Sequence, residues 1–297
     1  VETHSLKPFA NRVFSTMSMM EHSISFVNNN HKELISLNKQ ADRETAKYYL
    51  STKKKFPLVL KGNGKYDKYM FKGFEWYDEH SELTGSTVRK YTNKPLEIEI
   101  PIFNKANSEK KISVPVAYLI PQQFSEIIDV IKTHQIKFNV LKSSKNIKVE
   151  KYRFEDVRFA PRPYEGRQLP SFKCNAFIEK VDVDAGTLIV YTNQRQLRVI
   201  VNLLEPEAPD SFVNWGFFNA FFERKEYAEA YVMEPYAKQM MKEDSSLRNE
   251  FYKKLNEDES FRNNGGERLD FFYKLSPFYD RGENIYPIMR LINKSNI

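Results

Sequence analysis

Hydrophobic residues near the N-terminus recur at the intervals that a helix requires. Intervals of four, three, four and three residues separate Val13, Met17, Met20, Ile24 and Val27. Residues spaced in this way lie on one face of a helix. The pattern predicts a helix that begins near Pro8, because proline suits a first helical turn, and that ends at the asparagines 28–30. A second, more polar helix is expected over residues 31–50.

From Phe56 onward the helical spacing gives way to alternation. Residues 96–102 alternate between leucine or isoleucine and glutamate or proline, which is typical of a half-buried strand. Gly62-Asn63-Gly64 and Asp184-Ala185-Gly186 are typical of turns between strands. Short strands at this spacing favour an antiparallel sandwich. The other expected strands are 56–60, 69–77, 87–91, 112–120, 148–154, 172–181 and 187–192.

One helix is expected among these strands and several after them. Pro121 precedes an apolar stripe at helical spacing, formed by Phe124, Ile127, Ile128 and Ile131. After Gln196 the chain becomes helical, and three aspartates occupy positions typical of helix N-caps: Asp210, Asp244 and Asp258. The fold class predicted is α+β, with N-terminal helices, an antiparallel β-sandwich-like domain and a helical C-terminal layer packed on it. The expected boundaries are 1–52, 53–193 and 194–297.

Composition narrows the class of protein further. The 297 residues are 41% hydrophobic and 29% charged, as in globular proteins, and no apolar run is long enough to span a bilayer. The net charge is +7, but the lysine clusters 53–55 and 110–111 are too short to predict a nucleic-acid partner. The single cysteine, Cys174, excludes an intrachain disulfide. Its place in an alternating stretch favours a buried structural thiol over a reactive one.

No motif for metal or nucleophilic chemistry is present. The spacing of zinc-ligand pairs is missing from the five histidines, His4, His22, His31, His80 and His134, so no metal site is predicted within this chain. The sequence has no Gly-x-Ser-x-Gly elbow, and Gly62-x-Gly64 lacks the rest of a phosphate-binding loop. Glu97 and Glu99 share the exposed face of one strand, where we expect them to be solvated.

Two internal segments are richer in aromatic and rigid residues than an ordinary loop. The first, residues 160–167, combines two prolines with Tyr164 and two arginines. The second runs from Leu204 through two prolines into the aromatic residues of 212–218. We expect this second run to form a buried helix contact, and a ligand groove is the alternative.

Several stretches resemble secreted bacterial zinc carboxypeptidases of the carboxypeptidase A type. The opening "VETHSLKPFANRV", followed by an amphipathic helix, is similar to the end of their catalytic domain. Later stretches resemble the C-terminal extension of those proteins: "VPVAYLIPQ", "PYEG", "TNQRQLRVIVNLLEPEAPDSFVNWGFFN", "YVMEPYAKQM" and "LDFFYKLSPFYDR" with "YPIMRL". The resemblance is strongest over residues 1–14 and 112–291 and weakest over 30–95.

The resemblance implies one catalytic residue in this chain. Glu2 matches the family's general base, which takes a proton from zinc-bound water as that water attacks the peptide carbonyl. The family's zinc ligands, substrate-binding arginine and active-site tyrosine have no counterpart here, so the resemblance places them upstream of Val1. It thus implies a secreted or periplasmic protein in which an upstream catalytic domain holds the zinc and binds the peptide substrate. This chain, which opens without Met like a cut through a larger protein, is expected to be inactive alone.

A binding module without a direct role in catalysis is the alternative function. Such a sandwich would bind glycan, peptidoglycan or peptide. Glycan modules place coplanar aromatic rings on one face, whereas Trp76 and Tyr77 are adjacent and so point to opposite faces of a strand. This arrangement weakens the glycan alternative but does not remove it.

Overall fold

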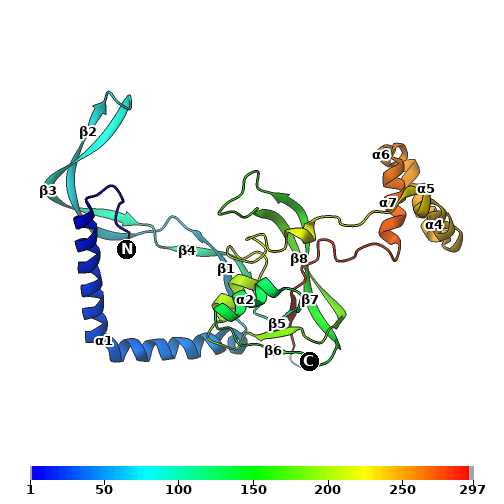
Figure 1. Ribbon diagram of the computed structural model, residues 1–297, viewed down its shortest axis with the longest axis horizontal. Coiled ribbons are helices and arrows are strands. Elements are labelled where there is room, and N and C mark those ends of the chain that lie inside the picture. The colour runs from blue at the N-terminus through cyan, green and yellow to red at the C-terminus, as the bar shows by residue number, and fades with distance from the viewer. Residues whose placement is uncertain (1, 294–297) are drawn as a thin grey trace. The chain divides into compact units, whose positions relative to one another are not determined.

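The computed structural model describes residues 2–293 and confirms the α+β class (Figure 1). The chain forms two compact units. One comprises residues 51–114, and the other combines the chain up to Leu50 with everything after Val114. These bounds differ from the predicted segments 1–52, 53–193 and 194–297, which stay a prediction.

The N-terminal helix α1 is continuous from Phe9 to Thr52, so the predicted end at the asparagines 28–30 is wrong. The Asn30 side-chain amide donates to the Phe26 carbonyl one turn earlier in α1, at 2.8 Å. A side-chain bond to the carbonyl four residues back is compatible with a continuous helix and often bends it. Figure 1 shows the helix changing direction part-way along its length.

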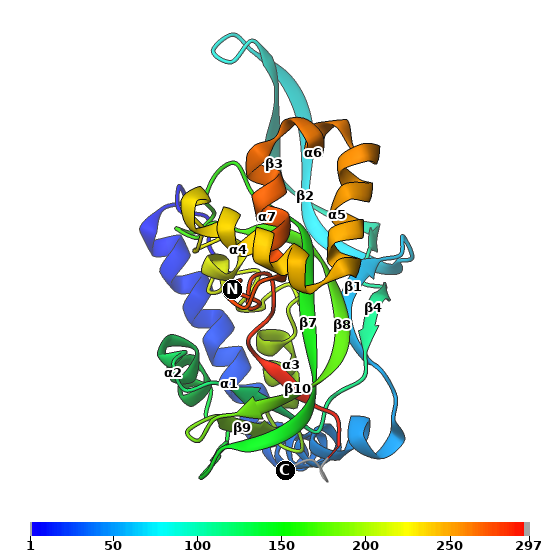
Figure 2. The same ribbon diagram turned by 90° about the vertical axis from the view of Figure 1, so that its right-hand side faces the viewer.

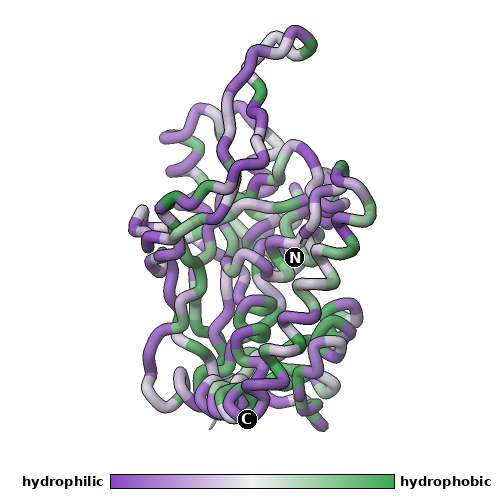
Figure 3. The backbone as a smooth tube through the Cα atoms, turned by 90° about the vertical axis from the view of Figure 1, so that its left-hand side faces the viewer, coloured by the Kyte–Doolittle hydropathy of each residue, from purple (hydrophilic) through white to green (hydrophobic). Residues whose placement is uncertain are grey.

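The apolar stripe predicted on this helix is exposed among the described residues. Exposure is 47% for Met17, 59% for Met20 and 66% for Ile24. Figure 3 shows hydrophobic, green segments recurring along the helix near the N-terminus. The periodicity therefore identified a helix face correctly, but the structure described here provides no cover for it.

The unit of residues 51–114 consists of two antiparallel strand pairs. Strand β2 (Asp67–Ser81) pairs with β3 (Ser86–Ile102), and β1 (Phe56–Gly62) pairs with β4 (Ala106–Ile112). Cross-strand ion pairs join the two glutamates of the alternating stretch to lysines, Glu97 to Lys72 at 3.5 Å and Glu99 to Lys68 at 2.7 Å. These exposed pairs match the expectation of solvated carboxylates.

The second unit contains a six-stranded antiparallel sheet in the order β6-β9-β5-β10-β7-β8. Its last strand in the chain, β10, lies between β5 and β7, as Figure 2 shows for β10 and β7. The sequence pattern did not predict β10, because three residues are too few to display alternation. The strand bounds are β5 Ala117–Ile120, β6 Asn139–Val140, β7 Lys145–Phe159, β8 Pro170–Val183, β9 Leu188–Tyr191 and β10 Met289–Leu291.

Helices pack on one face of this sheet. The predicted helix after Pro121 is confirmed as α2 (Ser125–Thr133), and α3 spans Leu197–Leu204. Buried residues of both helices form one apolar cluster with Tyr118 and Ile120 of β5. A sandwich of two sheets packed face to face is not confirmed, because helices and an aromatic segment cover this face.

The C-terminal part of the chain is helical, as predicted. Asp244 caps α5 by accepting hydrogen bonds from the backbone of Ser246 and Leu247, and Asp258 caps α6. The predicted cap at Asp210 is wrong, because a turn and not a helix follows it. These helices share an apolar cluster of their own. The elements are η1 Asn219–Phe222, α4 Ala230–Glu243, α5 Ser245–Glu257, α6 Glu259–Asn263 and α7 Gly265–Leu275.

A buried carboxylate joins α3 to three strands. Glu205, which follows α3, is only 1% exposed. The Tyr118 hydroxyl donates to its Oε1 at 2.5 Å, and the Tyr152 hydroxyl donates to its Oε2 at 2.8 Å. Arg290 Nε lies 3.0 Å from the same Oε1, and Arg290 Nη1 pairs with Glu150.

Burial and the negative charge of Glu205 raise the pKa of the Tyr118 and Tyr152 hydroxyls, which therefore stay protonated donors. The Glu205 carboxylate is thus neutralised by Arg290 and bonded by two tyrosines. Because Tyr118 belongs to β5, Tyr152 to β7 and Arg290 to β10, one side chain fixes three strands against the end of α3.

We expect Glu205→Ala to lower the free energy of unfolding of the full chain by about 3–5 kcal/mol, because the buried Arg290 would lose one of its two carboxylate partners and two buried tyrosine hydroxyls would lose their acceptor. Urea unfolding followed by far-UV circular dichroism measures this loss. The matched control is Glu155→Ala, at an exposed position of β7, which should change stability by less than about 0.5 kcal/mol. Equal stabilities of the two variants would contradict a structural role for the network.

Candidate functional site

Glu2, the catalytic residue that the sequence resemblance implies, lies in the exposed segment before α1. Its carboxylate forms no hydrogen bond or ion pair with another residue between 2 and 293. The side chain is therefore accessible, and its catalytic role stays a prediction.

The described residues do not provide a zinc site. Between residues 2 and 293, no group of three or more His, Cys, Asp or Glu side chains is arranged to hold a metal ion. Ring nitrogens of His22 and His31 bond to backbone carbonyls of α1, at 2.7 Å and 2.8 Å. The donor set of residues 2–293 therefore does not fit zinc. Among residues 2–293, none of the helices combines the length and the hydrophobicity that a membrane-spanning helix needs.

The two aromatic segments singled out in the sequence lie together. Residues 160–167 connect β7 to β8, and the Tyr164 ring lies 6.2 Å from the Trp215 ring. The Arg167 guanidinium is 4.4 Å from the centre of the Phe217 ring. Asn219 Nδ2 also donates to the Gln168 carbonyl, at 2.8 Å.

The segment around Trp215 consists of turns, so the predicted helix is wrong, but the predicted burial is confirmed for Phe212, Val213 and Phe218. Gly216 has a φ of +74°, a left-handed conformation that a regular helix does not contain. The buried Ser211 hydroxyl donates to the Pro206 carbonyl and accepts from the Asn214 backbone, which stabilises the turn. Phe212 and Phe218 are buried, whereas Trp215 is only partly buried.

The turn segment borders a groove of about 570 Å³. Its walls come from the end of α2, from α3 and from residues 210–217. Six of the residues that line it are Val130, His134, Arg198, Leu203, Trp215 and Phe217, and Asp210 lies at the same groove. Its volume is within the range of sites that bind small molecules or short peptide segments.

Two ionisable groups of this groove have no partner inside the described structure. Within residues 2–293, neither the His134 ring nor the Asp210 carboxylate forms a side-chain hydrogen bond or ion pair. Sequence reasoning missed both, because they lie 76 positions apart and belong to no motif. Only the packing of α2 against the segment after α3 brings them to one groove.

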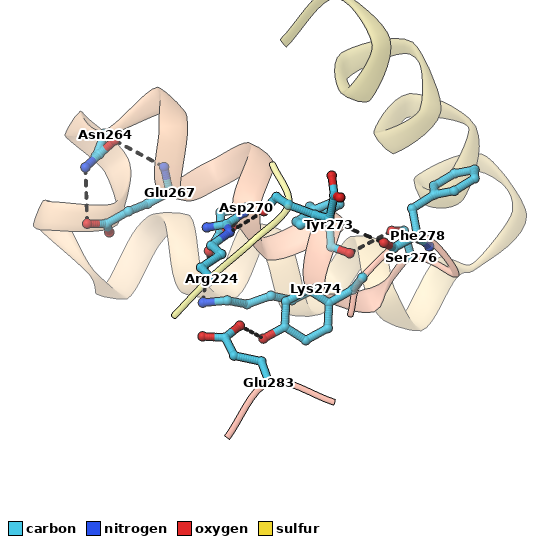
Figure 4. A network of polar contacts seen from close by, with 11 residues as sticks. Arg224, Asn264, Glu267, Asp270, Tyr273, Lys274, Ser276, Phe278 and Glu283 are labelled. Carbon is cyan, nitrogen blue, oxygen red and sulfur yellow. Dashed lines mark hydrogen bonds and ion pairs between the residues drawn. The ribbon is translucent and has the colours of Figure 1, made fainter. Parts of the chain in front are cut away.

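A second polar cluster lies among the C-terminal helices (Figure 4). A cavity of about 520 Å³ lies beside it. Asp270 of α7 pairs with Arg224 at 2.6 Å and with Lys274 at 2.9 Å. The Arg224 guanidinium also lies 5.2 Å from the centre of the Tyr273 ring. Burial disfavours the charged carboxylate, but Lys274 and Arg224 outweigh it and lower the pKa of Asp270.

The polar groups of this second cluster are occupied by one another. Asn264 bonds to Glu267 at 3.1 Å, and Tyr279 donates to Glu283 at 2.8 Å. We therefore interpret the cluster as a structural link between the segment that contains Arg224 and α7. The groove beside Trp215, with two unpartnered ionisable groups, is the stronger candidate for binding.

Comparison with known proteins points to carboxypeptidases for a part of the chain. The chain is 31% identical over 104 residues to Carboxypeptidase 2 of Trichophyton tonsurans. These matched residues make up 35% of this chain and 19% of that protein. Carboxypeptidase 2 of Trichophyton equinum has the same identity and coverage, and that of Trichophyton rubrum is 30% identical over 104 residues. No protein-family model and no solved structure matches the chain.

These matches support a carboxypeptidase-like relationship and nothing finer. The chain spans about a fifth of the length of the curated relatives it matches. The relatives are fungal, so the matches do not support a bacterial source, and they do not support a C-terminal place in the protein.

We expect Asp270→Asn to lower the free energy of unfolding at pH 6 by about 1–3 kcal/mol, because it weakens hydrogen bonds between charged groups. The pKa of Asp270 is lower in the folded state than its ordinary value of 3.8. Its contribution is therefore complete above that value and is lost as the pH falls through the folded-state pKa.

The difference between the wild type and Asp270→Asn should accordingly shrink as the pH falls below about 4. Denaturant unfolding at pH 6 and pH 3 measures it. Asp129→Asn, at an exposed position of α2, is the control and should have little effect at either pH. A difference that is the same at both pH values would refute the charge-based role of Asp270.

Proposed function

We propose that this chain belongs to a zinc metallocarboxypeptidase-like protein, as a C-terminal segment that supports or shapes the peptidase domain during peptide hydrolysis. The observation that carries the proposal is the 30–31% identity over 104 residues to Carboxypeptidase 2. In this proposal the zinc is held by residues outside the chain, because the described residues do not fit it. The complete protein is secreted or periplasmic.

The exposed stripe on α1 supports a docking role for this helix. An apolar surface of this kind marks a contact with another protein surface or with a membrane. Between Phe9 and Val27 the helix carries only two charged residues, Arg12 and Glu21. Helices that lie on membrane surfaces are usually rich in lysine and arginine, so a protein surface fits better. In the proposed complete protein that surface belongs to the peptidase domain.

The position of Glu2 supports a role at the edge of such a domain. Glu2 precedes α1 by only a few residues, so docking of α1 would bring its accessible carboxylate to the peptidase domain. There it would act as the general base of peptide hydrolysis.

In the complete protein, Glu2→Gln should reduce kcat for C-terminal residue release by about 10²–10⁴-fold, because glutamine keeps the shape of glutamate but cannot accept a proton. Steady-state hydrolysis of a short peptide measures this, with zinc content and melting temperature as checks on folding. Glu33→Gln, at an exposed position of α1, should leave kcat unchanged. Wild-type turnover by Glu2→Gln would reject the proposed role of Glu2.

The chain of residues 1–297 by itself should bind zinc no more tightly than roughly micromolar, since a tight site needs three or four converging ligands. It should also release no C-terminal residue from peptides. Calorimetric titration with zinc and a peptide-release assay with and without a chelator measure both. Tight stoichiometric zinc, or turnover that the chelator abolishes, would show that the chain contains a complete active site.

A further inference from the structure

The groove beside Trp215 combines an apolar wall with polar groups of both kinds. Leu203, Phe212, Trp215 and Phe217 provide the apolar surface. Arg198 carries a positive charge, and the His134 ring offers a nitrogen that donates a hydrogen bond in the appropriate tautomer. Asp210 carries a negative charge and is exposed. A ligand that used all three features would need an apolar body, an acidic group and a basic group.

Two of the polar groups in the groove, Asp210 and His134, are available to a ligand. Asp210 and His134 have no side-chain partner among residues 2–293, so a ligand would not have to break an existing ion pair to reach them. By contrast, the carboxylates of the helical cluster around Asp270 are already paired with basic side chains. Charge complementarity therefore favours the groove over that cluster as a binding site.

We propose that this groove binds a short peptide that has a free amino group, a free carboxylate and a large apolar side chain. The ammonium pairs with Asp210, and the carboxylate accepts hydrogen bonds from Arg198 and His134. The apolar side chain packs against Trp215 and Phe217. This site contains neither Glu2 nor any residue of the proposed catalytic function, and it does not depend on that function.

The aromatic geometry favours a peptide over a saccharide. Flat saccharide platforms use coplanar rings, whereas the planes of Tyr164 and Trp215 differ by 39°. A neutral saccharide would also leave the negative charge of Asp210 without a complementary partner. A peptide with two free termini matches both charges and uses the rings only for apolar contact.

Intrinsic fluorescence can report binding directly. The chain has two tryptophans, Trp76 and Trp215. In the full chain carrying Trp76→Phe, emission comes from Trp215 at the groove alone. We expect a saturable change of this emission on titration with the dipeptide Ala-Phe. Its C-terminal amide, and separately its N-acetyl form, should each bind about tenfold or more weakly, because each removes one charge.

A variant can assign the amino group to its partner. Asp210→Asn should weaken binding of Ala-Phe about tenfold but leave the affinity for N-acetyl-Ala-Phe unchanged, since that ligand has no ammonium. The matched control is Asp129→Asn on α2, which makes the same chemical change away from the groove and should leave both affinities unchanged. Melting temperatures of the variants check that the fold is intact.

Three outcomes would overturn the proposal. One is the absence of a saturable signal with Ala-Phe, and another is equal binding of Ala-Phe, its amide and its N-acetyl form. The third is stronger binding of the disaccharide chitobiose, which would assign the groove to glycans. Loss of peptidase activity in a Glu2 variant has no bearing on any of them, so the two proposals fail independently.

Discussion

The second unit depends on one buried charge. Glu205 is almost completely buried, and a carboxylate in such a place is tolerated only when it is paired and hydrogen-bonded. Tyr118, Tyr152 and Arg290 supply those partners from three different strands. The requirement to satisfy this single carboxylate therefore specifies which strands lie beside the end of α3.

The same interaction explains the place of the short strand β10. Three residues provide few backbone hydrogen bonds, yet β10 lies in the interior of the sheet between β5 and β7. Arg290, its central residue, faces Tyr118 on one side and Glu150 on the other in the strand register. Its guanidinium pairs with Glu150 and Glu205, so charge pairing inside the sheet adds to the apolar packing of its neighbours.

The network also places the groove. Leu204 and Glu205 end α3, and Arg198 and Leu203 of the same helix line the groove with Trp215. The turn that carries Trp215 begins a few residues later and is held by the buried Ser211 hydroxyl. The candidate binding site is thus formed on elements that the buried carboxylate and the turn bonds fix in position, which reduces the conformational entropy that a ligand must overcome.

The sequence by itself determined the class of fold and most of its elements. Alternation located β2, β3, β7 and β8, helical spacing located α1 and α2, and the side chains of Asp244 and Asp258 marked true N-caps, because these signals depend on local geometry. Only the tertiary structure decided the rest. The Asn30 side chain bonds within a helix that the asparagines 28–30 were expected to end, and Gly216 turns a segment expected to be helical. Arg290 holds β10 in the sheet through its pairs with Glu150 and Glu205. His134 and Asp210 meet at one groove for the same reason: contacts between residues far apart in the chain leave no periodic trace in the sequence.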